Sequence, residues 1–92
     1  MFVKTISGES AEIIVPNNTS EIRDYAFYRY IQLSKITIPV SVKKIGSYAF
    51  YSCSNLERVD MAEGVTEIEA YAFYECSKLQ NITLPNSITQ IG

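Results

Sequence analysis

The stretch that decides the fold is LSKITIPVSVKKIGSYAFYSC, residues 33–53. Its Ala-Phe pair recurs at a constant step of 23 residues, at 26–27, 49–50 and 72–73. This step divides the chain into an N-terminal segment, three repeats and a partial repeat, at residues 1–9, 10–32, 33–55, 56–78 and 79–92. A fixed period of this length is the sequence signature of a solenoid, in which each repeat forms one coil. We therefore predict a single domain over the 92 residues, with the N-terminal segment capping the first coil.

The apolar residues of successive repeats fall into aligned columns. The thirteenth position of the repeat is isoleucine in every copy, at Ile22, Ile45, Ile68 and Ile91. Two tyrosine columns lie on either side of the Ala-Phe pair, at Tyr25, Tyr48 and Tyr71 and at Tyr28, Tyr51 and Tyr74. Because strands of one sheet stack about 4.8 Å apart, each column is expected to form a continuous ladder through the coils.

Apolar and polar residues alternate over four segments, at residues 12–15, 35–38, 58–61 and 81–84. This alternation predicts about four short parallel strands, which would form the concave sheet of a right-handed β or α/β superhelix. Proline follows three of these strands and turns the chain. The Val-x-x-Ile segment that follows predicts a second, shorter extended stretch in each coil. The Tyr-Ala-Phe-Tyr block fits a 3₁₀ or single helical turn on the convex side.

The columns of residues 33–53 resemble those of the BspA-type leucine-rich repeat, also called the treponemal class. The matching positions are Leu33, Ile36, Ile38, Pro39, Ser41, Val42, Ile45, Gly46, Ala49, Phe50 and Cys53. The resemblance extends over residues 10–92, with departures at Ser10, Ala62 and Tyr30. It implies a leucine-rich-repeat solenoid that binds proteins and does not catalyse a reaction. Because members resemble surface proteins and adhesins of bacteria and protist parasites, it also implies a cell-surface or secreted location and a host matrix or cell-surface protein as partner.

The composition argues against most catalytic and cofactor chemistry. The chain has no histidine, which removes the commonest general base and metal ligand. Two cysteines are too few for a four-ligand zinc site, and the four glycines form no phosphate loop. We therefore expect no catalytic residues, no metal and no cofactor. The paired carboxylates Glu67 and Glu69 are interpreted as solvated side chains.

Charge and hydropathy exclude two further classes of partner. A net charge of −2 gives no basic field for nucleic acid. The apolar runs are too short to span a membrane, so we expect no membrane insertion. The first eight residues, MFVKTISG, lack the apolar core of a signal peptide. On this ground we expect either a cytoplasmic protein or one whose leader has been removed, and the cellular location stays open.

The outward side chains of the concave sheet are the first candidate binding surface. The residues assigned to partner binding are Glu12, Lys35, Thr37, Arg58, Asp60, Asn81 and Thr83, with Ile14 in the same columns. They form a strip of mixed charge without a large aromatic residue, so the affinity of this strip alone is expected to be modest. The alternative is a solvated sheet face with no partner.

The tyrosine columns and the cysteines each have two interpretations. The tyrosines form either an exposed aromatic binding strip or a stack of rings that covers the core with its hydroxyls in water. Cys53 and Cys76 occupy one column in adjacent coils, where their Cα atoms would lie about 5 Å apart. A disulfide is therefore geometrically possible, and the alternative is a pair of buried free thiols.

The partial repeat suggests a third surface. The sequence stops before the Tyr-Ala-Phe block of the fourth coil, so the last coil is expected to leave an open apolar edge. The edge residues are Leu79, Ile82, Leu84, Ile88 and Ile91. They predict a homo-oligomer that assembles through this edge, as a self-assembling repeat unit. The alternative is that the chain is a fragment of a longer repeat protein.

Overall fold

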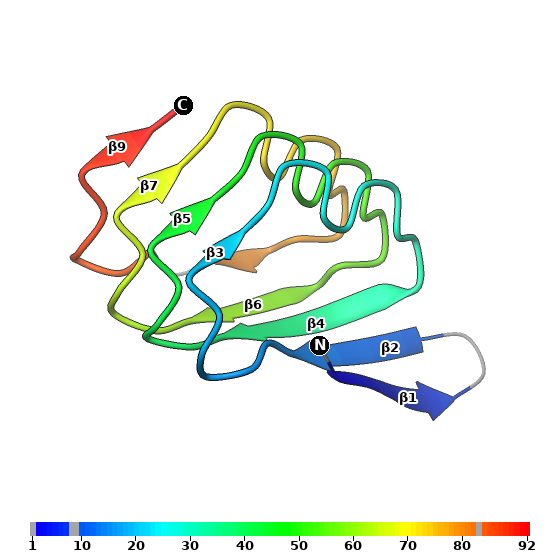
Figure 1. Cartoon of the computed structure of the whole chain (residues 1–92). Coiled ribbons are helices and arrows are strands. Elements are labelled where there is room, and N and C mark those ends of the chain that lie inside the picture. Colours follow the sequence, from blue (N-terminus) through cyan, green and yellow to red (C-terminus); the bar gives the residue numbers. More distant parts are fainter. Residues whose placement is uncertain (1, 8–9, 83) are drawn as a thin grey trace.

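The computed structural model describes the backbone of residues 2–7, 10–82 and 84–92 and the side chains of residues 11–80, 82 and 84–92. The chain winds as a solenoid with two sheets (Figure 1). The five-stranded sheet consists, in spatial order, of β1 (Phe2–Ser7), β2 (Ser10–Ile14), β4 (Leu33–Ile38), β6 (Arg58–Met61) and β8 (Asn81–Ile82). The four-stranded sheet consists of β3 (Glu21–Ile22), β5 (Lys44–Ile45), β7 (Glu67–Ile68) and β9 (Gln90–Ile91).

Strands of successive coils pair in parallel. Lys35 of β4 lies opposite Arg58 of β6, and Ile22 of β3 lies opposite Ile45 of β5. Hydrogen bonds between coils also join residues 23 positions apart, such as that from Ser34 Oγ to the Ala11 carbonyl. The predicted parallel sheet and the shorter extended stretches are therefore present. The strands β2 and β4 begin two residues earlier than the alternation indicated.

The first strand, β1, has the opposite direction. It pairs antiparallel with β2, with Phe2 opposite Ile14 and Lys4 opposite Glu12. We predicted a capping role for this segment but no strand, because residues 1–9 do not share the repeat pattern. In Figure 1, β1 lies at the end of the five-stranded sheet beside the first coil.

The Tyr-Ala-Phe-Tyr block is not helical. No helix occurs in the described parts of the chain, and the block forms successive turns instead. Tyr25, Tyr48 and Tyr71 have φ values of 61°, 58° and 60°, which interrupt any helical run. Alternate N–H groups also bind the next coil, as Phe27 N–H donates to the Ala49 carbonyl at 2.7 Å. We infer that these inter-coil bonds offset the cost of the left-handed conformation at a residue other than glycine.

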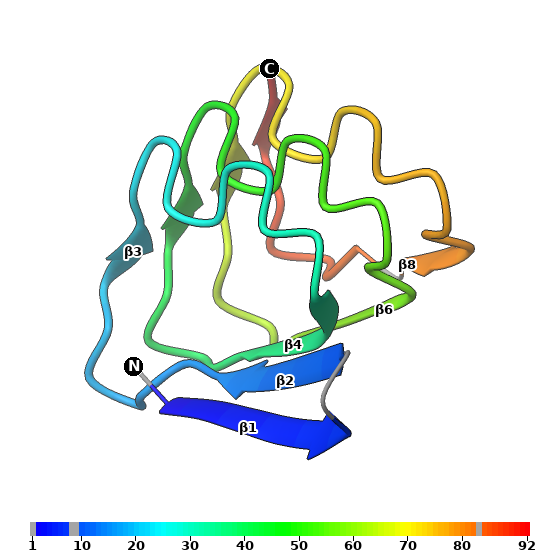
Figure 2. The same cartoon turned by 90° about the vertical axis from the view of Figure 1, so that its right-hand side faces the viewer.

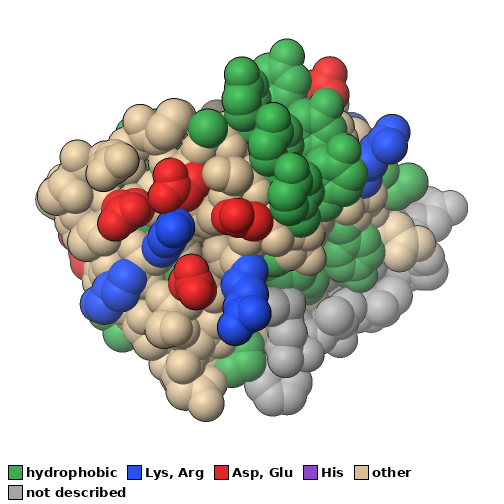
Figure 3. Space-filling view, turned by 45° about the horizontal axis from the view of Figure 1, so that its top comes forward, with side chains coloured by type: hydrophobic (Ala, Val, Ile, Leu, Met, Phe, Trp, Pro, Cys, Tyr) green, Lys and Arg blue, Asp and Glu red, His purple; other side chains and the backbone are tan. Residues whose placement is uncertain are grey.

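The apolar columns meet inside a cross-section with three sides. Figure 2 shows the five-stranded sheet along the base, the four-stranded sheet up one side and the turns of the Tyr blocks closing the third. Phe50 is fully buried, and its ring stacks between those of Phe27 and Phe73 with centroids 5.2 and 5.0 Å away. The isoleucines of the strands fill the rest of the interior. The tyrosines of the same turns point outward and gather into an apolar patch on the surface shown in Figure 3.

Candidate functional site

An ion cluster lies on the outer face of the five-stranded sheet. Asp60 accepts a hydrogen bond from Arg58 Nε at 3.0 Å, and Lys35 Nζ lies 3.5 Å from its other carboxylate oxygen. The hydrogen bond from Arg58 holds the pKa of the Asp60 carboxyl below its usual value, and Lys35 adds to this effect. One acid thus lies between two bases, which leaves the cluster with one net positive charge. The Arg58 side chain is 64% exposed and is available to a partner.

The structure brings together five of the seven residues assigned to this face. Thr37 lies opposite Asp60 in the paired strands, beside Lys35 and Arg58. Glu12 belongs to the same strip through its pairing with Lys35. The side chain of Asn81 and all of Thr83 lie outside the described residues, so their assignment stays a prediction. Ile14 is 54% exposed, which gives the strip an apolar position at β2.

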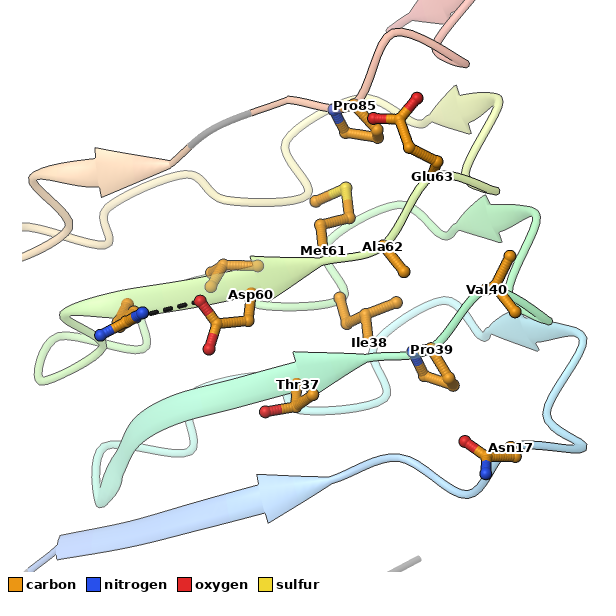
Figure 4. A pocket seen from close by; sticks show the side chains of 12 residues that line it. Asn17, Thr37, Ile38, Pro39, Val40, Asp60, Met61, Ala62, Glu63 and Pro85 are labelled. Atoms are coloured by element: carbon orange, nitrogen blue, oxygen red, sulfur yellow. Dashed lines mark hydrogen bonds and ion pairs between the residues drawn. The ribbon is translucent and has the colours of Figure 1, made fainter.

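A groove with a volume of about 800 Å³ adjoins the ion cluster. Its lining includes Ala62, which occupies the column that holds Pro39 and Pro85 in the neighbouring coils. A smaller side chain at this corner leaves a notch between the two prolines (Figure 4). The walls are largely apolar, and they include Val40, which is 61% exposed, and the half-buried Met61.

The two ends of the groove differ in charge. Arg58 and Asp60 line one end, where the ion cluster is net positive. Glu63 lines the other end, where its Oε2 accepts a hydrogen bond from the Asn86 N–H at 3.0 Å. Three of the lining residues, Thr37, Arg58 and Asp60, could be assigned to the site from the sequence, whereas the other groove residues were missed. The signal that could have found them is the departure of Ala62 from the proline column.

The tyrosine rows form a second outward surface. We define them as Tyr25, Tyr48 and Tyr71 in the first row and Tyr28, Tyr51 and Tyr74 in the second. Ring centroids within a row are 5.1 to 5.7 Å apart and the rings stack, whereas rings of the two rows meet at an angle. Tyr25, Tyr71 and Tyr74 are more than half exposed. The rings are therefore stacked and also available at the surface, so the two interpretations from the sequence do not exclude each other.

The cysteine column faces the interior and contains free thiols. The Cys53 thiol donates to the Phe27 carbonyl and the Cys76 thiol to the Phe50 carbonyl, at 3.2 and 3.0 Å. The Cys76 side chain and then burial raise the pKa of the Cys53 thiol. A buried thiol held in its protonated form is a poor nucleophile, so Cys53 has a packing role.

The residues assigned to the open edge are only partly covered in the last coil. Leu84 is 41% exposed and Ile91 is 60% exposed, whereas Leu79, Ile82 and Ile88 are half-buried against the core. Their role in self-association stays a prediction from the sequence.

Within residues 2–7, 10–82 and 84–92, no three acidic, cysteine or histidine side chains are grouped so that they could hold a metal ion. The same part of the chain contains no helix with the length and apolar character needed to cross a membrane.

Comparison with known proteins assigns the repeat to a family. The family model described as the BspA type leucine rich repeat region matches residues 2–92. The chain is 32% identical to a T. pallidum leucine-rich repeat protein of known structure, with a TM-score of 0.87 over 92% of this chain and 42% of that one. It is 29% identical to a leucine rich cell surface protein from Faecalibacterium prausnitzii, with a TM-score of 0.78 over 97% of this chain and 30% of that one.

A third solved structure supports the fold alone. It is a leucine-rich repeat protein from Bacteroides ovatus, 24% identical, with a TM-score of 0.82 over 99% of this chain and 30% of that one. The chain thus spans less than half the length of each of these three proteins. No curated protein sequence gives a significant match.

Proposed function

This chain belongs to the BspA-type leucine-rich repeat family, and from that premise we propose that it is a non-catalytic protein-binding module of the surface or adhesion type. The family fold is generally one of protein interaction. The similarity to a protein described as a leucine rich cell surface protein supports the surface assignment. Under this proposal the partner is a matrix or cell-surface protein of a host.

The groove beside Arg58 is the observation that supports this function best. It combines an apolar notch with an exposed guanidinium, and specific interfaces use such a combination of a buried anchor and a charged neighbour. An aliphatic side chain of the partner would occupy the notch between Pro39 and Pro85. A carboxylate of the partner would bind Arg58, whose cluster has one net positive charge.

The proposal predicts that Arg58→Glu lowers the affinity for a matrix protein at least about tenfold. The substitution reverses the charge at the mouth of the groove and places a second acid beside Asp60. Biolayer interferometry against a panel of purified extracellular matrix glycoproteins measures the dissociation constant of each variant. The matched control is Lys78→Glu, which makes the same charge change at an exposed side chain outside the groove. Equal affinities of Arg58→Glu and the parent chain for every bound matrix protein would refute the assignment.

A further inference from the structure

We propose that the tyrosine rows are a homotypic interface, on which a second copy of this chain packs antiparallel about a two-fold axis near Tyr51. This surface lies on the turns of the Tyr blocks and shares no residue with the groove.

The exposure of the rows is more than the packing of the core requires. The phenylalanines of the same turns already close the interior, with Phe27 and Phe50 buried. The tyrosines lie outside them, and Tyr25, Tyr28, Tyr71 and Tyr74 are 56%, 42%, 55% and 51% exposed. The six rings together expose on the order of 500 Å², which reaches the size at which surface patches of monomers are often functional.

Stacking within the rows determines which part of each ring a partner meets. The faces of Tyr48 and Tyr51 are covered by the rings before and after them in the same row. Ring edges and hydroxyl groups are therefore what the surface offers in the middle coil. A tyrosine hydroxyl both donates and accepts hydrogen bonds, so two such surfaces can pair with each other without an unmatched donor.

The spacing of the rows favours a second copy as the partner. Ring centroids repeat at 5.1 to 5.7 Å along both rows, because each coil contributes one ring to each row. A partner that contacts the rings of all three coils must present groups at the same spacing. A second copy of the chain presents tyrosine rings at the same spacing. An antiparallel arrangement therefore places the tyrosine pair of each coil opposite a pair of the other copy.

The charges beside the second row match under a two-fold axis. The position that follows each tyrosine of that row is Arg29 in the first coil, Ser52 in the second and Glu75 in the third. A two-fold axis near the middle coil places Arg29 of each copy opposite Glu75 of the other. A parallel arrangement would instead place like charges together. A two-fold interface requires this kind of self-complementarity, because the same patch acts on both subunits.

Local contacts fix the Glu75 carboxylate and the Arg29 backbone at the margin of the rows. Ser52 Oγ donates to Glu75 Oε1 at 3.1 Å, which fixes the carboxylate beside the middle coil. The N–H of Arg29 donates to the Tyr51 carbonyl at 2.7 Å, which fixes the backbone from which the guanidinium extends. Two copies would bury on the order of 1,000 Å² in total, near the lower limit of specific interfaces, so we expect a dissociation constant in the micromolar range.

Sedimentation equilibrium from about 1 µM to about 500 µM tests the proposal. The parent chain is expected to form a dimer in this range. Arg29→Glu and Glu75→Arg should each weaken the dimer about tenfold or more, because each places like charges opposite each other at both ends of the interface. The double variant restores the opposite charges and should recover the parent dissociation constant to within about threefold. Tyr51→Ser removes the central ring of the second row and should also weaken the dimer.

The control is Lys43→Glu, an exposed charge reversal outside the rows that should leave the dimer unchanged. Far-UV circular dichroism checks that each variant is folded. A parent chain that stays monomeric across the range would overturn the proposal. A dimer that is indifferent to both single charge reversals, or that the double variant does not recover, would overturn it as well.

Discussion

Phe50→Ala is expected to lower the free energy of unfolding by about 3–5 kcal/mol. Phe50 is fully buried and stacks on the phenylalanines of both neighbouring coils, so its loss leaves a cavity at the centre of the solenoid. A chain of this length typically has about 5–14 kcal/mol of stability, so the loss is a large share. Urea denaturation followed by circular dichroism gives the free energy and, from its slope, shows whether the transition stays two-state.

The matched control is Phe73→Ala. Phe73 is half-buried in the last rung of the same stack, so the cavity it leaves opens toward solvent and the expected loss is smaller. A decrease in the free energy of unfolding below about 1 kcal/mol for Phe50→Ala would contradict a core that the coils share, because cavities at well-packed sites cost more than that.

Gly64→Ala is expected to lower the free energy of unfolding by about 2 kcal/mol or more, which is the second large effect. A Cβ at position 64 would lie 2.3 Å from the Val40 carbonyl oxygen. That oxygen is part of the preceding coil's backbone, so relief of the clash requires the spacing between two coils to change. No described glycine has a positive φ, so close approach, and not backbone conformation, accounts for glycine here. Thermal unfolding should show a lower midpoint.

Ser41→Ala is the control at the same repeat position, one coil earlier. Among the described residues, the buried Ser41 Oγ has no hydrogen-bond partner. Its removal should therefore be neutral or slightly stabilising. Gly64→Ala with a midpoint equal to that of the parent chain would show that the coils separate at no cost.

The repeat made the strands and the core predictable. A column such as Ile22, Ile45 and Ile68 recurs in every coil, and its position relative to the polar residues reports which side of a strand faces inward. Residues 1–9 lack this recurrence, so the strand β1 could not be predicted. The same limit applies to any segment that occurs once in a repeat protein.

The Tyr block shows where the pattern is ambiguous. Its alanine and aromatic residues are compatible with a helical turn, and nothing in the residue types indicates the positive φ of Tyr25 or Glu75. That conformation depends on carbonyl groups offered by the adjacent coil, which are set by the stack as a whole. The exposure of the tyrosine rings was left open for the same reason, since the residue types alone do not show how much of each ring the neighbouring coils cover.

The candidate groove depends on a single departure from the repeat. Arg58 and Asp60 could be assigned from strand alternation, because it places them on the outer face of β6. The notch beside them arises because Ala62 is smaller than the prolines in the coils before and after it. A departure of this kind is visible in the sequence, but its consequence for surface shape follows only from the stacked coils.

Hydroxyl-radical footprinting of the chain with a bound matrix protein tests the central claim most directly. Met61 lines the groove and tyrosines form the rows on the other surface, so both surfaces contain readily oxidised side chains. At a chain concentration below that of dimer formation, the account predicts that the partner protects Met61 from oxidation and leaves the tyrosine rows as reactive as in the free chain. Unchanged oxidation of Met61 in the complex would contradict the assignment of the groove as the binding site.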